Sequence, residues 1–394
     1  MNLKWFLSRT VRHATEMRKH VGKLLSAQRD ILSPPAIDAI TAAIGDLIRA
    51  VAANADKKAL LKQMESLEKV ANKWLKPYPH SAIRENIEVI LVAVAVAMAI
   101  RTFFLQPFKI PTGSMQPTLY GITIDDLKSK PDFKVPGGFS RFVNACFRGT
   151  FYHYLQAEAD GELIDVGPLE HVIKFVNKQR ITMRYNLGGN LVDKSHTVWF
   201  APDERLAERA NLRSGQSFHK GDEIIKLKEV AGDHLFVNRL TYNFRHPKRG
   251  EIIVFETRGI EDPRMPQDQF YIKRLVALGG ERVQIGDDRH LIINRTNRLD
   301  ASTPHFENVY SFNPKEPPQE SHYSGHVNAM YLAPLFQDKH EGYVVRPDHY
   351  MVMGDNTVNS FDSRAWGDFS RTNVIGKSFF VYWPISERFG WGHR

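Results

Sequence analysis

The sequence predicts a mainly β protein in which an antiparallel β domain follows a single transmembrane helix and an N-terminal helical segment. Three observations predict this fold class. Short β-rich runs bounded by turn residues dominate the chain beyond Gly121, one long apolar stretch lies at residues 85–108, and apolar residues recur at helical spacing before it. We therefore expect three parts: a helical segment at 1–84, a transmembrane anchor at 85–105 and a β-rich domain at 106–394.

The composition is that of a folded protein with two or three structural units. The chain has 394 residues, of which 42% are hydrophobic and 25% are charged, and one hydrophobic core seldom serves so many residues. The single cysteine, Cys146, excludes an intramolecular disulfide, and no C-x-x-C or histidine cluster indicates a metal site. The formal net charge is +9, but no nucleic-acid-binding motif accompanies it, so we expect no nucleic-acid partner.

The segment before the apolar stretch shows two helical registers. Apolar residues step by three and four over residues 37–51 and again over residues 60–74. The two registers are out of phase, which predicts a helical hairpin; a short coiled coil with a partner is the alternative. Residues 1–33 have only scattered apolar side chains, and we expect Pro34-Pro35 to end any helix there.

The stretch "ENIEVILVAVAVAMAIRTFFLQPF", residues 85–108, is the most apolar in the chain. Twenty helical residues, 86–105, rise about 30 Å, which is the thickness of the hydrocarbon core of a bilayer. The charged residues Glu88 and Arg101 lie near its ends, where their side chains can reach the headgroups. The alternative is a buried core helix, because the uninterrupted apolar run, 89–100, is short for a span.

The flanking charge favours the span and predicts its orientation. Residues 1–85 contain 15 Lys plus Arg against 8 Asp plus Glu. The positive-inside rule then places this part in the cytoplasm and everything after Leu105 outside. The first residues lack the long apolar run of a cleaved signal peptide, so we expect an uncleaved anchor in the lipid bilayer.

Beyond Gly121 the apolar pattern becomes strand-like. The runs are bounded by Gly, Asp, Asn and Pro, and no long helices alternate with them, which favours an antiparallel sheet over a parallel α/β sheet. The runs are "EIIVF" (251–255), "YIKRLVAL" (271–278), "RVQI" (282–285), "HLIIN" (290–294), "YMVMG" (350–354) and "SFFVYW" (378–383).

The string "PTGSMQPTL", residues 111–119, places one serine, Ser114, among turn-forming residues. Taken alone, this string indicates a serine in a turn more readily than a nucleophile. The chain has no G-x-S-x-G or H-E-x-x-H motif to compete with it. Ser217-Phe218-His219-Lys220 fits S-x-x-K but lacks the companion S-D-N and K-T-G elements. The candidate nucleophile is therefore Ser114.

Five ordered blocks of the sequence carry a family resemblance. They are "IPTGSMQPTL" (110–119), "GDHLFVNRLTYNF" (232–244), "PKRGEIIVF" (247–255), "YIKRLVALGGERV" (271–283) and "GDNTVNSFDSRAWG" (354–367). In order and content they resemble the bacterial type I signal peptidases, also called leader peptidases. The resemblance runs from the anchor to about Pro384, and residues 1–84 lie outside it.

The resemblance implies a membrane-anchored serine endopeptidase that removes signal peptides from secretory precursor proteins without a cofactor. It implies cleavage after small residues in an A-x-A-like pattern. The enzyme would lie in the cytoplasmic (inner) membrane as a single-pass protein, with its catalytic domain on the periplasmic side.

The family uses a Ser/Lys dyad, and the matching positions are Ser114 and Lys273. A serine hydroxyl needs a base within hydrogen-bond reach to act as a nucleophile. Lysine can be that base only when its pKa falls well below the usual value of about 10.4. Burial lowers the pKa because it penalises the ammonium form, and the apolar neighbours of Lys273 at 271–272 and 275–276 can supply it.

The resemblance also assigns residues that support the dyad. The Thr112 hydroxyl and the Ser114 backbone N–H would form the oxyanion hole for the tetrahedral intermediate. Ser360 would hydrogen-bond the Lys273 amine. Two ion pairs would fix the last block against the strand that carries Lys273: Asp362 with Arg364, and Asp355 with Arg274. Shallow pockets for small substrate side chains would be lined by Phe108, Ile110, Tyr271 and Ile272.

The chain departs from the family pattern at two positions and in two regions. Thr357 stands where the family usually has arginine, and Gly279 replaces the proline of Leu-Pro-Gly. The two dyad residues are 159 positions apart, which is more than in compact members. We therefore expect an insertion at about 122–215 and a second variable region at about 288–347.

Two other classes of protein remain open. One is a self-cleaving Ser/Lys protease of the SOS-repressor kind, which would need a DNA-binding module in place of the anchor. The other is a catalytically dead, membrane-bound β domain that binds partners. A dead variant would be expected to lose one dyad residue, and both Ser114 and Lys273 are present.

Overall fold

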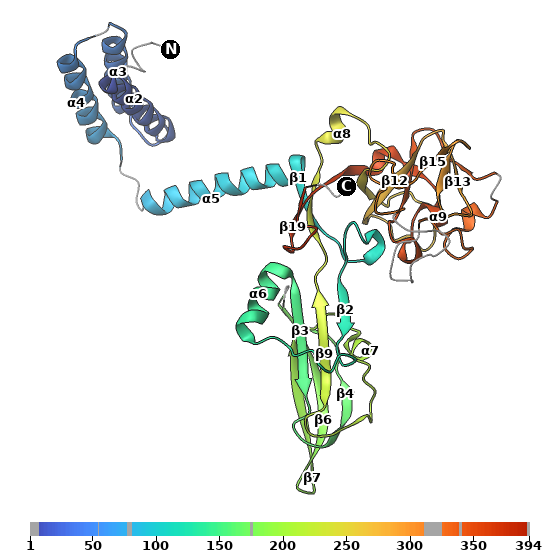
Figure 1. Ribbon diagram of the computed structural model, residues 1–394. Coiled ribbons are helices and arrows are strands. Elements are labelled where there is room, and N and C mark those ends of the chain that lie inside the picture. The colour runs from blue at the N-terminus through green and yellow to red at the C-terminus, as the bar shows by residue number, and fades with distance from the viewer. Residues whose placement is uncertain are drawn as a thin grey trace. The chain divides into compact units, whose positions relative to one another are not determined.

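The computed structural model describes residues 8–53, 55–76, 81–173, 176–310, 325–338 and 341–391 (Figure 1). The chain forms two compact units, Met1–Ala95 and Val96–Arg394. Parts of three predicted regions lie outside the described residues: 1–7, 54 and 77–80 of the helical segment, 174–175 of the first insertion, and 311–324 and 339–340 of the second variable region.

Among its described residues, the helical segment contains three helices: α2 (Arg9–Ala27), α3 (Pro34–Ala52) and α4 (Lys57–Trp74). The predicted hairpin corresponds to α3 and α4, and α2 covers it as a third helix. The three share a core in which Ala14, Ile40, Leu47 and Leu67 are fully buried. Here the expectation that Pro34-Pro35 ends a helix is wrong: α2 ends at Ala27, and the prolines begin α3. The first turn of a helix suits proline because its missing N–H would have no intrahelical partner there.

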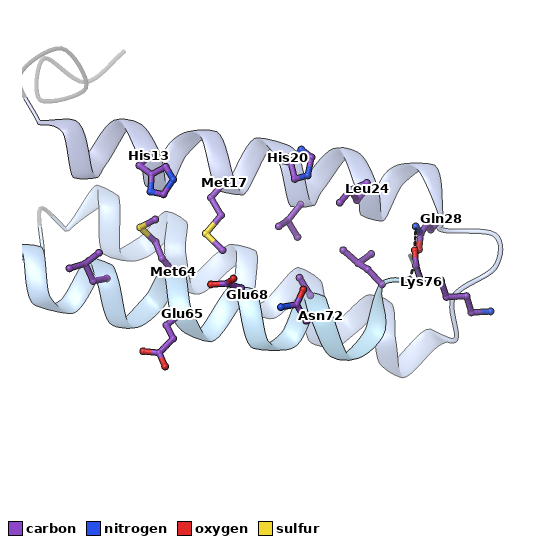
Figure 2. Close-up of a pocket in the computed structure, with 14 residues that line it drawn as sticks. His13, Met17, His20, Leu24, Gln28, Met64, Glu65, Glu68, Asn72 and Lys76 are labelled. Carbon is purple, nitrogen blue, oxygen red and sulfur yellow. Dashed lines mark hydrogen bonds between the residues drawn. The ribbon is translucent and has the colours of Figure 1, made fainter. Parts of the chain in front are cut away.

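A cavity of about 1030 Å³ lies along α2 and α4. Figure 2 shows His13, Met17, His20 and Leu24 of α2 along it. At one end Gln28 donates to the Lys76 carbonyl at 2.9 Å and accepts from the Lys76 N–H at 3.0 Å. These two bonds tie the end of α2 to the chain just after α4.

The apolar segment forms α5 (Ser81–Ala99), continues as a π-helical turn at Ile100–Phe104 and leads into β1 (Leu105–Lys109). Residues Glu85–Phe104 form one helix that is long and apolar enough to cross a membrane, and none of its most apolar window is buried. This argues against the alternative of a buried core helix.

The rest of the chain is built from antiparallel sheets. The main sheet has the order β1-β10-β19-β11-β12-β17-β18, with β20 beside β19. A four-stranded sheet, β15-β14-β13-β16, belongs mostly to the second variable region. The strands are β10 (His234–Asn238), β11 (Ile252–Glu256), β12 (Phe270–Leu278), β13 (Arg282–Ile285), β14 (Leu291–Ile293), β15 (Asn297–Arg298), β16 (Tyr343–Val344), β17 (His349–Met353), β18 (Phe369–Ser370), β19 (Val374–Trp383) and β20 (Gly390–Trp391). The predicted mainly β fold, with one apolar helix and an N-terminal helical segment, is confirmed.

The region of the first insertion is folded, with its own core of Leu163, Ile181, Met183 and Ile224. It contains a sheet of order β2-β9-β3 and a second of order β5-β6-β4-β8, with β7 beside β6. Its elements are β2 (Thr123–Asp126), α6 (Gly138–Arg148), β3 (Thr150–Gln156), β4 (Gly161–Val166), β5 (Glu170–Ile173), β6 (Val176–Leu187), β7 (Asn190–Trp199), α7 (Leu206–Arg209), β8 (Ser217–Phe218) and β9 (Glu223–Val230). The folded region thus extends to Val230, past the expected end at 215.

The core of the helical segment gives a first prediction. Leu47→Ala should destabilise this three-helix unit by about 2–5 kcal/mol, because Leu47 is fully buried and its loss leaves a cavity. Leu61→Ala is the matched control, since Leu61 is 48% exposed. Hydrogen exchange of the full-length protein should show faster exchange throughout α2–α4 in the first variant only. Equal exchange in the two variants would contradict the packing.

Candidate functional site

The segment that carries Ser114 is a short turn held by hydrogen bonds from a distant part of the chain. Residues Gly113–Met115 form one 3₁₀ turn, in which the Ser114 side chain is buried. The Asn356 backbone N–H donates to the Ser114 carbonyl at 3.0 Å, and the Asn356 side chain donates to the Gly113 carbonyl at 3.1 Å. Just before the turn, a methyl group on Gly232 would lie 1.8 Å from the Ile110 carbonyl oxygen. Only glycine permits this close approach.

Lys273 lies on β12, in the interior of the main sheet between β11 and β17. Its Nζ is 2.6 Å from Ser114 Oγ, although the two residues are 159 positions apart. The side chain is buried, and burial lowers the pKa of Lys273 to about 8; the charges of Asp362 and Asp355 act in the opposite direction. The structure thus joins the two predicted dyad residues, with an amine that loses its proton more readily than an ordinary lysine.

The two carboxylates near Lys273 are each bound by an arginine. Asp355 accepts from Arg274 Nε at 2.7 Å, and Asp362 accepts from Arg364 Nε at 2.9 Å and Nη2 at 2.8 Å. All four side chains are at most 1% exposed. These are the two ion pairs expected from the sequence. Because each carboxylate is already paired, neither takes Lys273 as its ion-pair partner within the described residues.

Thr357, the departure from the family pattern, takes part in the same buried network. Its hydroxyl accepts from Arg364 Nη1 at 2.6 Å and from the Val327 N–H at 2.8 Å. Arg364 also donates to the Val327 carbonyl at 3.0 Å. Thr357 therefore connects the Asp362–Arg364 pair to the second variable region.

Gly279, the other departure, lies against a neighbouring turn. A methyl group on Gly279 would lie 2.9 Å from the Asp348 N–H nitrogen and 3.1 Å from the Arg346 carbonyl oxygen. A side chain at this position would push that turn away.

Ser360 is buried near the dyad but differs from the expectation in its contacts. Within the described residues, its Oγ makes no hydrogen bond to the Lys273 amine, so the expected bond is not formed. The physical reason is that the Ser360 side chain lies against Gly354, where an added methyl group would come within 2.2 Å of Oγ.

A pocket of about 450 Å³ opens beside the dyad. Three of the predicted pocket residues line it: Ile110, Tyr271 and Ile272. Thr112, the candidate oxyanion residue, also lines it. Phe108 is not among the lining residues; its ring packs edge-to-face on Phe270, which does line the pocket, with ring centroids 5.4 Å apart.

The structure adds residues that the sequence did not single out. Tyr331 and Leu332 of the second variable region line the pocket, and no sequence pattern indicates this. Thr118 bonds to both Asp355 and Arg274, and Asn356 holds the Ser114 turn. Thr118 and Asn356 lie within the sequence blocks that resemble the family, so the resemblance is the signal that could have identified them.

Comparison with known proteins identifies the family. A family model described as "Signal peptidase, peptidase S26" matches residues 83–127 and 226–383, just over half of the chain. The chain belongs to this family. Ser114 falls in the first S26 segment and Lys273 in the second, and the unmatched residues 128–225 include most of the predicted first insertion.

Individual relatives match about two fifths of the chain. Signal peptidase I of Leptolyngbya laminosa is 29% identical over 158 residues, which cover 40% of this chain and 63% of the relative. Probable signal peptidase I-2 of Synechocystis is 27% identical over 153 residues, which cover 39% of this chain and 56% of the relative. The match therefore spans less than two thirds of each of these relatives. A crystal structure of a signal peptidase I from Enterococcus faecalis is 28% identical and covers 34% of this chain and 97% of that chain, with a TM-score of 0.22.

The position of Thr357 gives a second prediction. Thr357→Val keeps the side-chain shape but leaves the Arg364 and Val327 donors without this acceptor, which should cost about 1–3 kcal/mol of unfolding free energy. The matched control is Thr197→Val, because Thr197 is exposed on β7. Thermal unfolding in detergent should show a lower midpoint for the first variant alone. A midpoint unchanged by Thr357→Val would contradict the role given to this hydroxyl.

Proposed function

We propose that the chain is a membrane-anchored endopeptidase that removes signal peptides from secretory precursor proteins, with Ser114 as nucleophile and Lys273 as general base. The observation that carries the proposal is the 2.6 Å distance between Lys273 Nζ and Ser114 Oγ in a buried site. Membership of the S26 family and similarity to proteins named signal peptidase I support the same reaction.

The chemistry follows from the state of the amine. A neutral Lys273 amine takes the Ser114 hydroxyl proton while Oγ attacks the scissile carbonyl carbon. The carbonyl oxygen becomes an oxyanion, which the Ser114 N–H and the Thr112 hydroxyl stabilise by hydrogen bonds. The Lys273 ammonium then gives its proton to the leaving amine, and the peptide bond breaks to leave an acyl group on Ser114. Water, deprotonated by Lys273, hydrolyses this ester and restores both residues.

The pocket supports a preference for small substrate side chains. Ile110, which is buried, and Ile272 contribute branched apolar side chains to its wall. A wall of this kind accepts a methyl group and resists a bulky side chain. Cleavage after Ala, Gly or Ser is therefore the specificity that we propose.

The exposed apolar helix supports anchoring in the lipid bilayer by a single span at Glu85–Phe104. The positive charge before it supports a cytoplasmic position for residues 1–84 and a periplasmic position for residues 106–394. Nine residues from Leu105 to Ser114 reach at most about 32 Å. This tether keeps the nucleophile near the membrane surface, where the cleavage site of a signal peptide emerges.

The test of the proposal is cleavage of a secretory precursor by the detergent-solubilised protein. Ser114→Ala should abolish cleavage, because no other group replaces the nucleophile. Ser217→Ala is the matched control: this serine fits S-x-x-K but lies exposed on β8, far along the chain from the site, and its variant should cleave at the wild-type rate. Cleavage by the folded Ser114→Ala variant would exclude the proposal.

The role of Lys273 makes a separate prediction. Lys273→Arg should be inactive although it preserves the charge, since a guanidinium stays protonated in proteins. In the wild type, kcat/KM should rise with pH, about tenfold per unit below the pKa of Lys273 near 8, and level off above it, because only the neutral amine accepts the proton. An active Arg variant would remove Lys273 from the role of base. A flat profile between pH 6 and 8, a range that begins about two units below that pKa and ends at it, would do the same.

Specificity can be checked with one precursor. Replacing alanine by phenylalanine immediately before the cleavage site should lower kcat/KM about ten- to a hundredfold, since overpacking commonly costs about 1–3 kcal/mol. The matched control is the same replacement well inside the mature sequence. Equal cleavage of the alanine and phenylalanine precursors would contradict the pocket assignment.

A further inference from the structure

Helix α6 of the first insertion turns aromatic side chains toward solvent. Phe139 is 83% exposed, Phe142 65% and Phe147 54%, and no residue of the helix is buried. Phe139, Phe142 and Cys146 are spaced by three and four, so they share one face of the helix. A surface helix of a soluble protein normally turns such a face toward the core. In α6 this apolar face is turned toward solvent.

The contacts of α6 fix this orientation. On the side opposite Phe139, Arg141 donates to the Tyr152 carbonyl of β3 at 2.6 Å, and α6 lies beside β3 (Figure 1). At its C-terminal end, the Trp383 indole donates to the Cys146 carbonyl and the Ile385 N–H donates to the Phe147 carbonyl, both at 2.7 Å. A helix held by its polar side and its last carbonyls cannot roll its phenylalanines inward without breaking these bonds.

We propose that α6 lies in the interface of an anionic lipid bilayer as a second membrane contact beside the apolar span. An interfacial helix has aromatic side chains on one face and bases on the other. The sequence of α6, "GFSRFVNACFR", has two arginines and no acidic residue, so its charge complements anionic headgroups. The inference rests on the proposed anchoring, but α6 lies outside the residues that match the S26 family.

The place where α6 is attached to the main sheet favours the bilayer over another protein as the partner that covers its apolar face. Trp383, which holds the end of α6, pairs with His234 of β10, and His234 pairs with Lys109 of β1. The other end of β1 is Leu105, where the apolar segment ends. Five strand residues span only about 17 Å. The helix is therefore attached within a short distance of the point where the chain leaves the lipid.

The single cysteine allows a direct test. Cys146 is exposed on the apolar face of α6, so an environment-sensitive fluorophore attached to it reports where that face lies. The full-length protein is reconstituted in vesicles of phosphatidylcholine and phosphatidylglycerol with or without brominated acyl chains. In vesicles without brominated lipid, we expect the emission of this label to be shifted to the blue relative to that of a label at a solvent-exposed site. In vesicles with brominated lipid, we expect this emission to be lost. Phe139→Ser combined with Phe142→Ser should reverse both changes.

Two control labels complete the design, each in a Cys146→Ser background. A label at Thr296→Cys, on the exposed turn between β14 and β15, should keep its emission. A label at Val92→Cys, within the apolar helix, should lose it. Quenching at Val92 without quenching at Cys146 would overturn the inference and leave the anchoring intact. Absence of quenching at Val92 would overturn the anchoring and the inference with it.

Two further outcomes separate the inference from its rivals. A blue shift at Cys146 that depends on protein density and not on brominated lipid would mean that a second copy covers α6, which would overturn the inference. The Ser114→Ala variant should be quenched like the wild type, because the contact does not depend on catalysis. Failure of the wild-type protein to cleave a precursor, with normal quenching at Cys146, would count against the proposed function only.

Discussion

The rest of the structure depends on one constraint: the Lys273 amine lies in the interior of a sheet, and the two carboxylates near it are already paired with arginines. Lys273 is 5% exposed and contacts Ser114 Oγ. A buried ammonium would be costly, so burial favours the neutral amine. Nearby carboxylates would restore the charge if they were free, but Asp355 and Asp362 are each held by an arginine. The ion pairs therefore carry no chemistry themselves, but they keep these carboxylates from pairing with Lys273, whose pKa burial lowers.

The surrounding architecture serves this placement. The backbone of β12 fixes Lys273 between two paired strands, and Asn356 fixes the Ser114 turn from the loop after β17. The second variable region joins the same network, because Val327 shares Thr357 and Arg364 as partners. Because this region also supplies Tyr331 to the pocket wall, its sequence can alter the substrate pocket while the dyad stays in place.

Much of the fold and of the site could be predicted from the sequence, where a strong local pattern existed. The apolar helix follows from one long run, and the juxtaposition of Ser114 and Lys273 follows from the ordered blocks. The third helix, α2, was not predicted, because its apolar residues are sparse and become meaningful only against α3 and α4. Tyr331 was missed because it lies in a variable region and reaches the pocket only through tertiary structure.

Side-chain geometry marks the limit of prediction from motifs. Ser360 is where the blocks place it, but its Oγ lies against Gly354 and makes no bond to Lys273. Phe108 belongs to the strand that leads to the site, but its ring packs on Phe270 and does not line the pocket. Both outcomes depend on contacts between residues far apart in the sequence, which no local pattern records.

The most direct test of this account is the pKa of the Lys273 amine in the folded protein. A nitrogen NMR titration of lysine-labelled protein in detergent, with Lys273 assigned by its absence from the Lys273→Arg variant, reports the charge of this one side chain. The account predicts a midpoint at about pH 8. A midpoint near the ordinary lysine value of about 10.4 would contradict it, because Ser114 would then face an ammonium that cannot accept its proton.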